Sequence, residues 1–210
     1  MRIQNNKNKA TDSVFDSSFK ESEQLPKKFT INFDSFLVDE RWKTKVTLDG
    51  FQLGDIINDN SKTSDYYRFH DIFHFSFAAI LGWSPCTRAM MKRKRKSDYW
   101  IDEVEDGARA TITEEALSMI IFNEAKRKNY FDGVNSVSKT TLRIIKEMTE
   151  DFEVNIRTAK EWEKAILKAY EVFRLLMANG GGKVEFDAFN SAISYTMRSS
   201  NRTNAYSKLA

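Results

Sequence analysis

The chain of 210 residues carries 33 basic and 30 acidic side chains, so its formal charge of +3 is a small difference that does not by itself indicate nucleic-acid binding. Its 41% hydrophobic and 13% aromatic content excludes a largely disordered chain and allows one domain with a sizeable core. The single Cys86 excludes an intrachain disulfide. No apolar run approaches the roughly 20 residues of a membrane helix, and the polar start lacks a signal-peptide core, so we expect a cytoplasmic protein.

The two ends of the chain are polar. Residues 1–24 are rich in Asn and Ser, and residues 199–210 contain few apolar side chains. We expect both to be flexible, the first as an arm and the second as a tail. Pro26 marks the entry into ordered structure, so residues 25–198 are predicted to form a single domain.

The first ordered third of the chain has β patterns. Residues 29–36 alternate apolar and polar side chains, as a half-buried strand does. Asp49 and Gly50 separate two further short runs, 45–48 and 51–53, and supply the positive φ that a tight primed turn needs. This region is therefore predicted to contain a β-hairpin.

Helical spacing follows from about residue 66 onward. The predicted helices span residues 66–81, 86–96, 101–129, 142–148 and 158–177. The third is either continuous or broken near Gly107: Thr111 and Glu114 have capping-box spacing, which favours a break, yet one glycine does not require it. Residues 180–182 end the last helix and residues 183–186 begin a strand. The fold class is α+β, with a mainly helical core, an N-terminal β-hairpin region and a late C-terminal strand.

The segment 68–74 (RFHDIFH) brings two imidazoles and a carboxylate into one helical turn. His70 and His74 are four residues apart and Asp71 lies three before His74, so all three share a side of the helix. The trio has the donors to hold a metal, or one histidine could act as a general base. The alternative is a core histidine with a satisfied hydrogen bond, because no third ligand is fixed by spacing.

An acidic cluster follows. Glu103 and Asp106 form a Glu-x-x-Asp pattern, and on a continuous helix Glu114 returns to within about 20° of the azimuth of Glu103. Hard oxygen ligands of this kind prefer magnesium or calcium to zinc. The alternative is a solvated acidic helix face on which Arg109 pairs with Glu105.

Residues 92–96 (KRKRK) form a basic block. On a helix, two or three of these five cations would face a single phosphate group. Runs of this length also occur as nuclear-localisation or nucleic-acid patches, so the block alone does not identify the ligand.

These motifs, in this order, resemble the C-terminal companion domain found in MazG-type nucleoside triphosphate pyrophosphohydrolase proteins. The likeness is carried by segments 67–74 (YRFHDIFH), 81–85 (LGWSP), 92–97 (KRKRKS), 102–110 (DEVEDGARA) and Glu114-Glu115, and it covers most of the chain. It implies a role in nucleotide metabolism, either in the removal of unwanted nucleotides or in defence against phage.

The resemblance also carries a departure. In the longer proteins a catalytic MazG module precedes this domain, and its magnesium site is built from a Glu-x-x-Glu helix and a later Glu-x-x-Asp helix. Here the first 60 residues have β patterns, and the Glu-x-x-Asp at Glu103 and Asp106 has no upstream Glu-x-x-Glu partner. Catalysis therefore does not follow from the resemblance alone.

Two hypotheses remain. The first is an enzyme that uses magnesium or manganese to cleave a nucleoside triphosphate into the monophosphate and pyrophosphate. The residues assigned to water activation are His70, Asp71 and His74. The expected metal ligands are Glu103, Asp106 and Glu114. The cations assigned to phosphate binding are Arg68, Lys92, Arg93, Lys94, Lys96 and Arg109.

The second hypothesis is a non-catalytic nucleotide-sensing or regulatory subunit. It would act in a complex with a separately encoded effector protein, for example in anti-phage defence, or as a homo-oligomer. Nucleic acid ranks below nucleotides as a ligand, and no membrane partner is expected. If there is a metal site, we expect His70, Asp71, Glu103 and Asp106 to lie close together.

Overall fold

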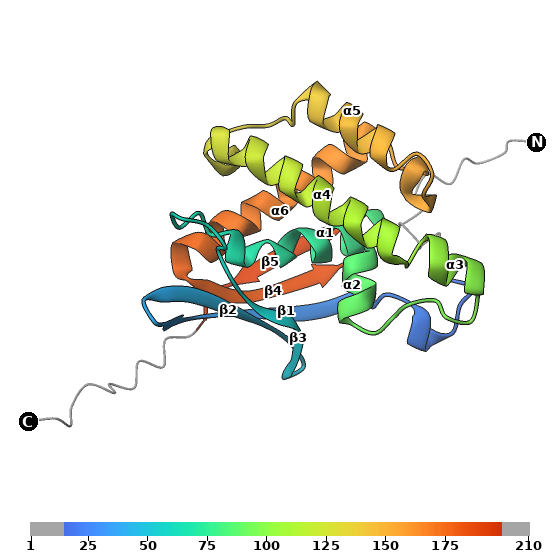
Figure 1. The fold of residues 1–210 in the computed structure, drawn as a ribbon, viewed down its shortest axis with the longest axis horizontal. Helices are drawn as coiled ribbons and strands as arrows, with labels where there is room; N and C mark the ends of the chain where they lie inside the picture. The colour runs from blue at the N-terminus through green and yellow to red at the C-terminus, as the bar shows by residue number, and fades with distance from the viewer. Residues whose placement is uncertain (1–14, 199–210) are drawn as a thin grey trace, which may run out of the picture.

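The computed structural model describes residues 15–198 and consists of two layers, a sheet and a set of helices over one of its faces (Figure 1). The sheet is antiparallel, with strand order β3-β2-β1-β4-β5. The strands are β1 (Lys28–Val38), β2 (Arg41–Leu48), β3 (Phe51–Asn58), β4 (Gly181–Asp187) and β5 (Ala192–Thr196). The predicted α+β class is confirmed, with three N-terminal strands and two late ones.

The sheet joins the two ends of the described chain because β1 pairs with both β2 and β4. Phe33 lies opposite Val46 of β2 and opposite Gly182 of β4. A Cβ at Gly182 would collide with the ring of Tyr195, so this strand position requires glycine. Only Gly180 caps the preceding helix, with φ of 63°, and residues 181–182 already belong to β4. The predicted strand therefore begins two residues earlier than expected.

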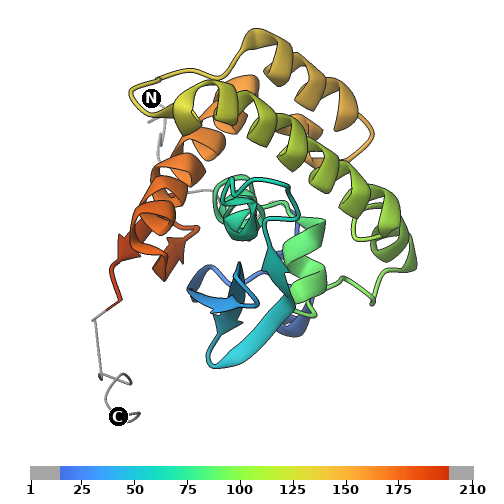
Figure 2. The same ribbon diagram turned by 60° about the vertical axis from the view of Figure 1, so that its left-hand side comes forward.

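Six α-helices are described, with short 3₁₀ turns between some of them. The helices are α1 (Asp71–Leu81), α2 (Pro85–Met90), α3 (Tyr99–Val104), α4 (Ala108–Arg127), α5 (Lys139–Met148) and α6 (Ala159–Asn179). The 3₁₀ turns are η1 (Glu21–Glu23), η2 (Tyr67–Phe69), η3 (Asn129–Phe131) and η4 (Glu153–Ile156). Figure 2 shows α1 nearly end-on at the centre of the molecule, with the sheet on one side and α4 and α6 on others.

The central position of α1 follows from its composition. Except for Asp71, His74 and Ser76 its side chains are apolar, and all of its residues are buried. Phe73 packs against the rings of Tyr170 and Phe173 in α6, and Phe75 packs on Phe33 of β1. A helix of this type is stable only when neighbours cover its whole surface, so any polar side chain on it must find a partner inside the protein.

One helix prediction is wrong, and an alternative left open for another is settled. The helix predicted over residues 86–96 ends at Met90, and Lys92 adopts a left-handed φ of 56°, so the basic block lies outside the helix. Of the two alternatives for residues 101–129, the structure has the broken one, and Gly107 at the break caps α4. A Cβ at Gly107 would collide with the carbonyl oxygen of Glu103, and this close approach explains the glycine.

Part of the predicted N-terminal arm is ordered. Within residues 15–24, Asp16 is fully buried and forms an ion pair of 2.9 Å with Arg88. The rest of the predicted arm (1–14) and the predicted tail (199–210) lie outside the described residues. In the part of the chain that is described, no helix has both the length and the apolar character needed to cross a bilayer.

Candidate metal centre

Three potential metal ligands lie together at the start of α1. His70 precedes the helix, Asp71 begins it and His74 follows one turn later, so one donor atom of each lies within 4.8 Å of the others. Their exposed fractions are 7%, 5% and 1%. Polar groups buried to this degree in an apolar helix need partners, and the contacts of the two imidazoles define what the cluster can do.

Both imidazoles are oriented through Nδ1. His70 Nδ1 lies 3.0 Å from the carbonyl oxygen of Tyr67, and His74 Nδ1 lies 2.8 Å from Oε1 of Glu114. Because both partners are acceptors, each Nδ1 carries the proton of its hydrogen bond. Metal-ligating histidines are held in this way, with Nε2 left for the metal. Within residues 15–198, His74 Nε2 is buried without a hydrogen-bond partner.

Glu115 adds a carboxylate at the solvent side of the cluster. Its Oε1 lies 3.5 Å from His74 Nε2, and its side chain is 45% exposed. Burial raises the pKa of Glu115, but the neighbouring His74 and His70 outweigh this effect and lower it to about 2. Glu115 is therefore an ionised, accessible donor beside the two imidazoles.

Glu114 lies behind the cluster and serves a different purpose. It is fully buried and accepts hydrogen bonds from Ser84 Oγ at 2.7 Å and from the Cys86 backbone N–H at 2.8 Å, in addition to His74. Ser84 also caps α2, so the start of that helix and Glu114 are fixed together. These contacts hold Glu114 against His74 Nδ1 as a hydrogen-bond acceptor, and the donor atoms of His74, Cys86 and Glu114 also lie within 4.8 Å of one another.

The two histidines are in different electrostatic environments. Burial lowers the pKa of His70 below its ordinary value, although Asp71 opposes this, so His70 is neutral and ready to bind a metal at pH 7. Burial also disfavours the charge on His74, but Glu114 holds its pKa well above the ordinary value. Burial raises the pKa of the neighbouring Cys86 thiol, so this thiol stays uncharged at pH 7. The negative charge that stabilises the protonated His74 is therefore that of Glu114. A divalent ion would replace the proton on His74 Nε2.

The predicted convergence of Glu103, Asp106 and Glu114 is wrong, because the break at Gly107 removes the continuous helix on which it depended. Asp106 is fully buried and accepts hydrogen bonds of 2.7 Å from the backbone N–H and from Nη2 of Arg95. Glu103 is exposed on α3. Among the described residues, neither belongs to a group of side chains spaced to hold a metal ion.

The predicted phosphate-binding cations separate into several environments. Arg93 Nη1 donates to the Glu21 carbonyl. Arg95, a member of the basic block that was not among the predicted phosphate ligands, is buried, bridges Asp106 to Glu153 and donates to the Phe15 carbonyl. These two arginines hold the segment before β1 against the helices. The three lysines of the block line a cleft of about 420 Å³: Lys92, Lys94 and Lys96.

The lysine cleft and the histidine cluster lie at opposite ends of α2. Cys86, at the start of the helix, has its Sγ 3.7 Å from Glu115, whereas the lysines follow its last residue. Arg68 is buried in an ion pair of 2.9 Å with Asp59, and Arg109 is exposed in the first turn of α4. The structure does not gather these cations around the candidate metal centre.

Sequence reasoning missed two contributors to the cluster. Glu115 was noted only as part of an acidic pair, although it supplies the accessible carboxylate. Tyr67 stacks on the imidazole of His70 with ring centroids 4.2 Å apart and planes 2° apart, which fixes that ring from the side. The spacing of Tyr67 and His70, three residues on a helical turn, was the available signal.

The fold and the cluster define an α+β protein with a candidate divalent-metal centre at the start of its central helix. The sequence profile of the MazG C-terminal domain matches residues 10–199, and the chain therefore belongs to the MazG C-terminal domain family. This confirms the resemblance noted from the motifs. No curated protein and no solved structure gives a significant match.

Proposed function

We propose that the chain is a divalent-metal-dependent hydrolase that converts a nucleoside triphosphate into the monophosphate and pyrophosphate. The observation that carries the proposal is the grouping of His70, Asp71 and His74, whose donor atoms lie within 4.8 Å of one another. Glu115 adds a carboxylate oxygen 3.5 Å from His74 Nε2. We choose a nucleotide as the substrate because the chain belongs to the MazG C-terminal domain family. In this reaction water forms a bond to the α-phosphorus, and pyrophosphate leaves with the bridging oxygen.

The donor set bears on the identity of the ion. Magnesium prefers an all-oxygen shell, whereas two imidazoles with two carboxylates suit manganese, iron, cobalt or zinc. We therefore place manganese before magnesium. Such an ion, when bound, supplies Lewis acidity to the phosphoryl oxygens and lowers the pKa of a bound water.

The residues of the chain supply orientation and access. Glu114 and Tyr67 fix the two imidazoles, so the donor atoms are set before a ligand arrives. Glu115 is the only one of the four proposed ligands, among the described residues, with substantial exposure, and the substrate is expected to approach from its side.

One observation favours a second candidate, the non-catalytic nucleotide-sensing subunit. His70, Asp71 and His74 are exposed by 7% or less, and a metal held this deeply suits a structural role. The chain would then bind its nucleotide without turnover and signal to a separate effector protein.

The test is release of pyrophosphate from a panel of canonical and damaged nucleoside triphosphates with manganese, cobalt or magnesium. We expect release that Glu115→Gln reduces at least 100-fold, while the matched carboxylate control Glu103→Gln leaves it unchanged. Absence of release, with nucleotides raising the melting temperature, would support the sensor instead. Absence of both effects would contradict both functions.

A further inference from the structure

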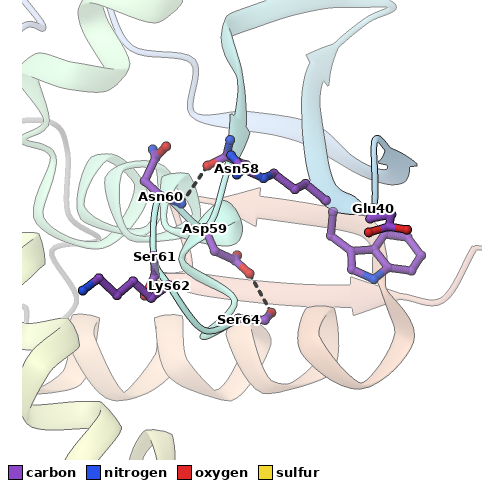
Figure 3. A pocket seen from close by; sticks show the side chains of 9 residues that line it. Glu40, Asn58, Asp59, Asn60, Ser61, Lys62 and Ser64 are labelled. Carbon is purple, nitrogen blue, oxygen red and sulfur yellow. Dashed lines mark hydrogen bonds between the residues drawn. The ribbon is translucent and has the colours of Figure 1, made fainter.

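A second site lies outside the histidine cluster. A cleft of about 540 Å³ opens between the turn that joins β1 to β2 and the loop that follows β3. Figure 3 shows Glu40 on one side and Asn58, Asn60 and Ser64 on the other. The volume lies within the range of small-molecule sites. The chemistry of the lining therefore indicates the ligand.

The cleft contains a supported aromatic ring. Trp42 lines it near the start of β2 and is 48% exposed. The guanidinium carbon of Arg68 lies 5.9 Å from the centroid of the indole and supports the ring, while the exposed part of the ring remains accessible. An indole held in this way offers a stacking surface for a planar heterocycle.

Hydrogen bonds hold the loop side of the cleft in place. Asp59 accepts from Arg68 Nη1 at 3.0 and 2.9 Å, from the Arg68 backbone N–H at 3.1 Å and from Ser64 Oγ at 2.6 Å. The Asn60 backbone N–H donates to Asn58 Oδ1 at 2.7 Å (Figure 3). Binding to a loop that is already ordered avoids the entropic cost of ordering it.

The charges and polar groups around the indole suit a phosphorylated ligand. Asp59 is neutralised by Arg68, so Arg41 and Lys62 exceed the remaining carboxylate of Glu40 by one positive charge. Carboxamides and hydroxyls in the same lining can donate to and accept from the edge of a heterocycle. A nucleotide combines the planar ring, the polar edge and the negative charge that these groups match.

We propose that this cleft binds a free nucleotide, with its base on Trp42 and its phosphate near Arg41. This proposal rests on the proposed function and gives the nucleotide a binding site outside the histidine cluster. The cleft is connected with the histidine cluster through η2, because Arg68 of that turn binds Asp59 while Tyr67 stacks on His70.

The test is calorimetric titration with ATP, GTP, CTP and UTP in metal-free buffer containing EDTA. We expect at least one nucleotide to bind, Trp42→Ala to weaken that binding about 10-fold or more, and Trp42→Phe to retain part of it. The control is Trp100→Ala, because Trp100 is 67% exposed on α3 outside the cleft. Arg41→Ala should weaken the nucleotide more than the corresponding nucleoside.

Binding of no nucleotide by the folded protein, or equal affinity of the wild type and Trp42→Ala, would overturn the proposal. The metal-free condition separates this result from that of the hydrolase. Pyrophosphate release that depends on Glu115 would leave the proposed function intact even if the cleft binds nothing. Binding at the cleft without any turnover would instead favour the nucleotide-sensing subunit.

Discussion

Glu105 provides a quantitative test of the buried charge network around Arg95 and Asp106. Its side chain is 7% exposed. Burial, together with the carboxylates of Glu153 and Asp106, raises its pKa from 4.5 to about 7, although the Glu153 N–H and Arg95 act in the opposite direction. The folded state thus retains a proton that the unfolded state loses between pH 4.5 and 7. The stability that this group contributes is complete below pH 4.5 and is lost as the pH rises through 7.

The change Glu105→Gln should remove this dependence, because the amide resembles the protonated acid. A difference of about 2.5 pKa units corresponds to about 3.4 kcal/mol, and partial solvent screening reduces the expected effect to about 2 kcal/mol. Urea unfolding at pH 5 and pH 8 should show that the variant gains this amount over the wild type between the two values. An equal pH dependence of stability in the wild type and the variant would show that Glu105 does not retain this proton in the folded state. Glu103→Gln, at an exposed position, is the matched control.

Three further predictions concern the break between α3 and α4 and the metal. Asp106→Asn should lower the free energy of unfolding by about 3 kcal/mol or more, because it leaves the buried charge of Arg95 poorly compensated. Chemical denaturation would measure this loss, and a loss below about 1 kcal/mol would contradict the prediction. Gly107→Ala should lower the melting temperature by several degrees, since its Cβ meets the Glu103 carbonyl; an unchanged temperature would contradict that contact. Manganese at 100 times its dissociation constant should stabilise the protein by about 2.7 kcal/mol, a gain that excess EDTA reverses, and no shift on adding it would contradict a site confined to the folded state.

The elements that could be predicted from the sequence are those set by local patterns. The alternation in residues 29–36 indicated β1, and Asp49-Gly50 indicated the β2–β3 turn. The turn between β1 and β2 was missed because Asp39 and Glu40 occupy it with left-handed φ values, where a hairpin usually has Asn or Gly.

The candidate centre could be predicted only in part, because only some of its residues are set by local patterns. His70, Asp71 and His74 are close in sequence, so helical spacing was enough to bring them together. The separate partners of Asp106 and Glu114 depend on contacts with residues 11 and 40 positions away, and no local pattern specifies these. Sequence composition alone treated all three predicted metal carboxylates as equivalent, whereas burial and pairing make them different.

The proposed function depends on one divalent ion held by His70, Asp71, His74 and Glu115. Calorimetric titration of manganese, cobalt, zinc and magnesium into the metal-free protein tests it most directly. We expect one ion per chain, tighter binding of manganese or cobalt than of magnesium, and a loss of affinity of about 10-fold or more in Glu115→Gln but not in Glu103→Gln. Absence of stoichiometric binding, or an affinity that depends on Glu103 and not on Glu115, would contradict it.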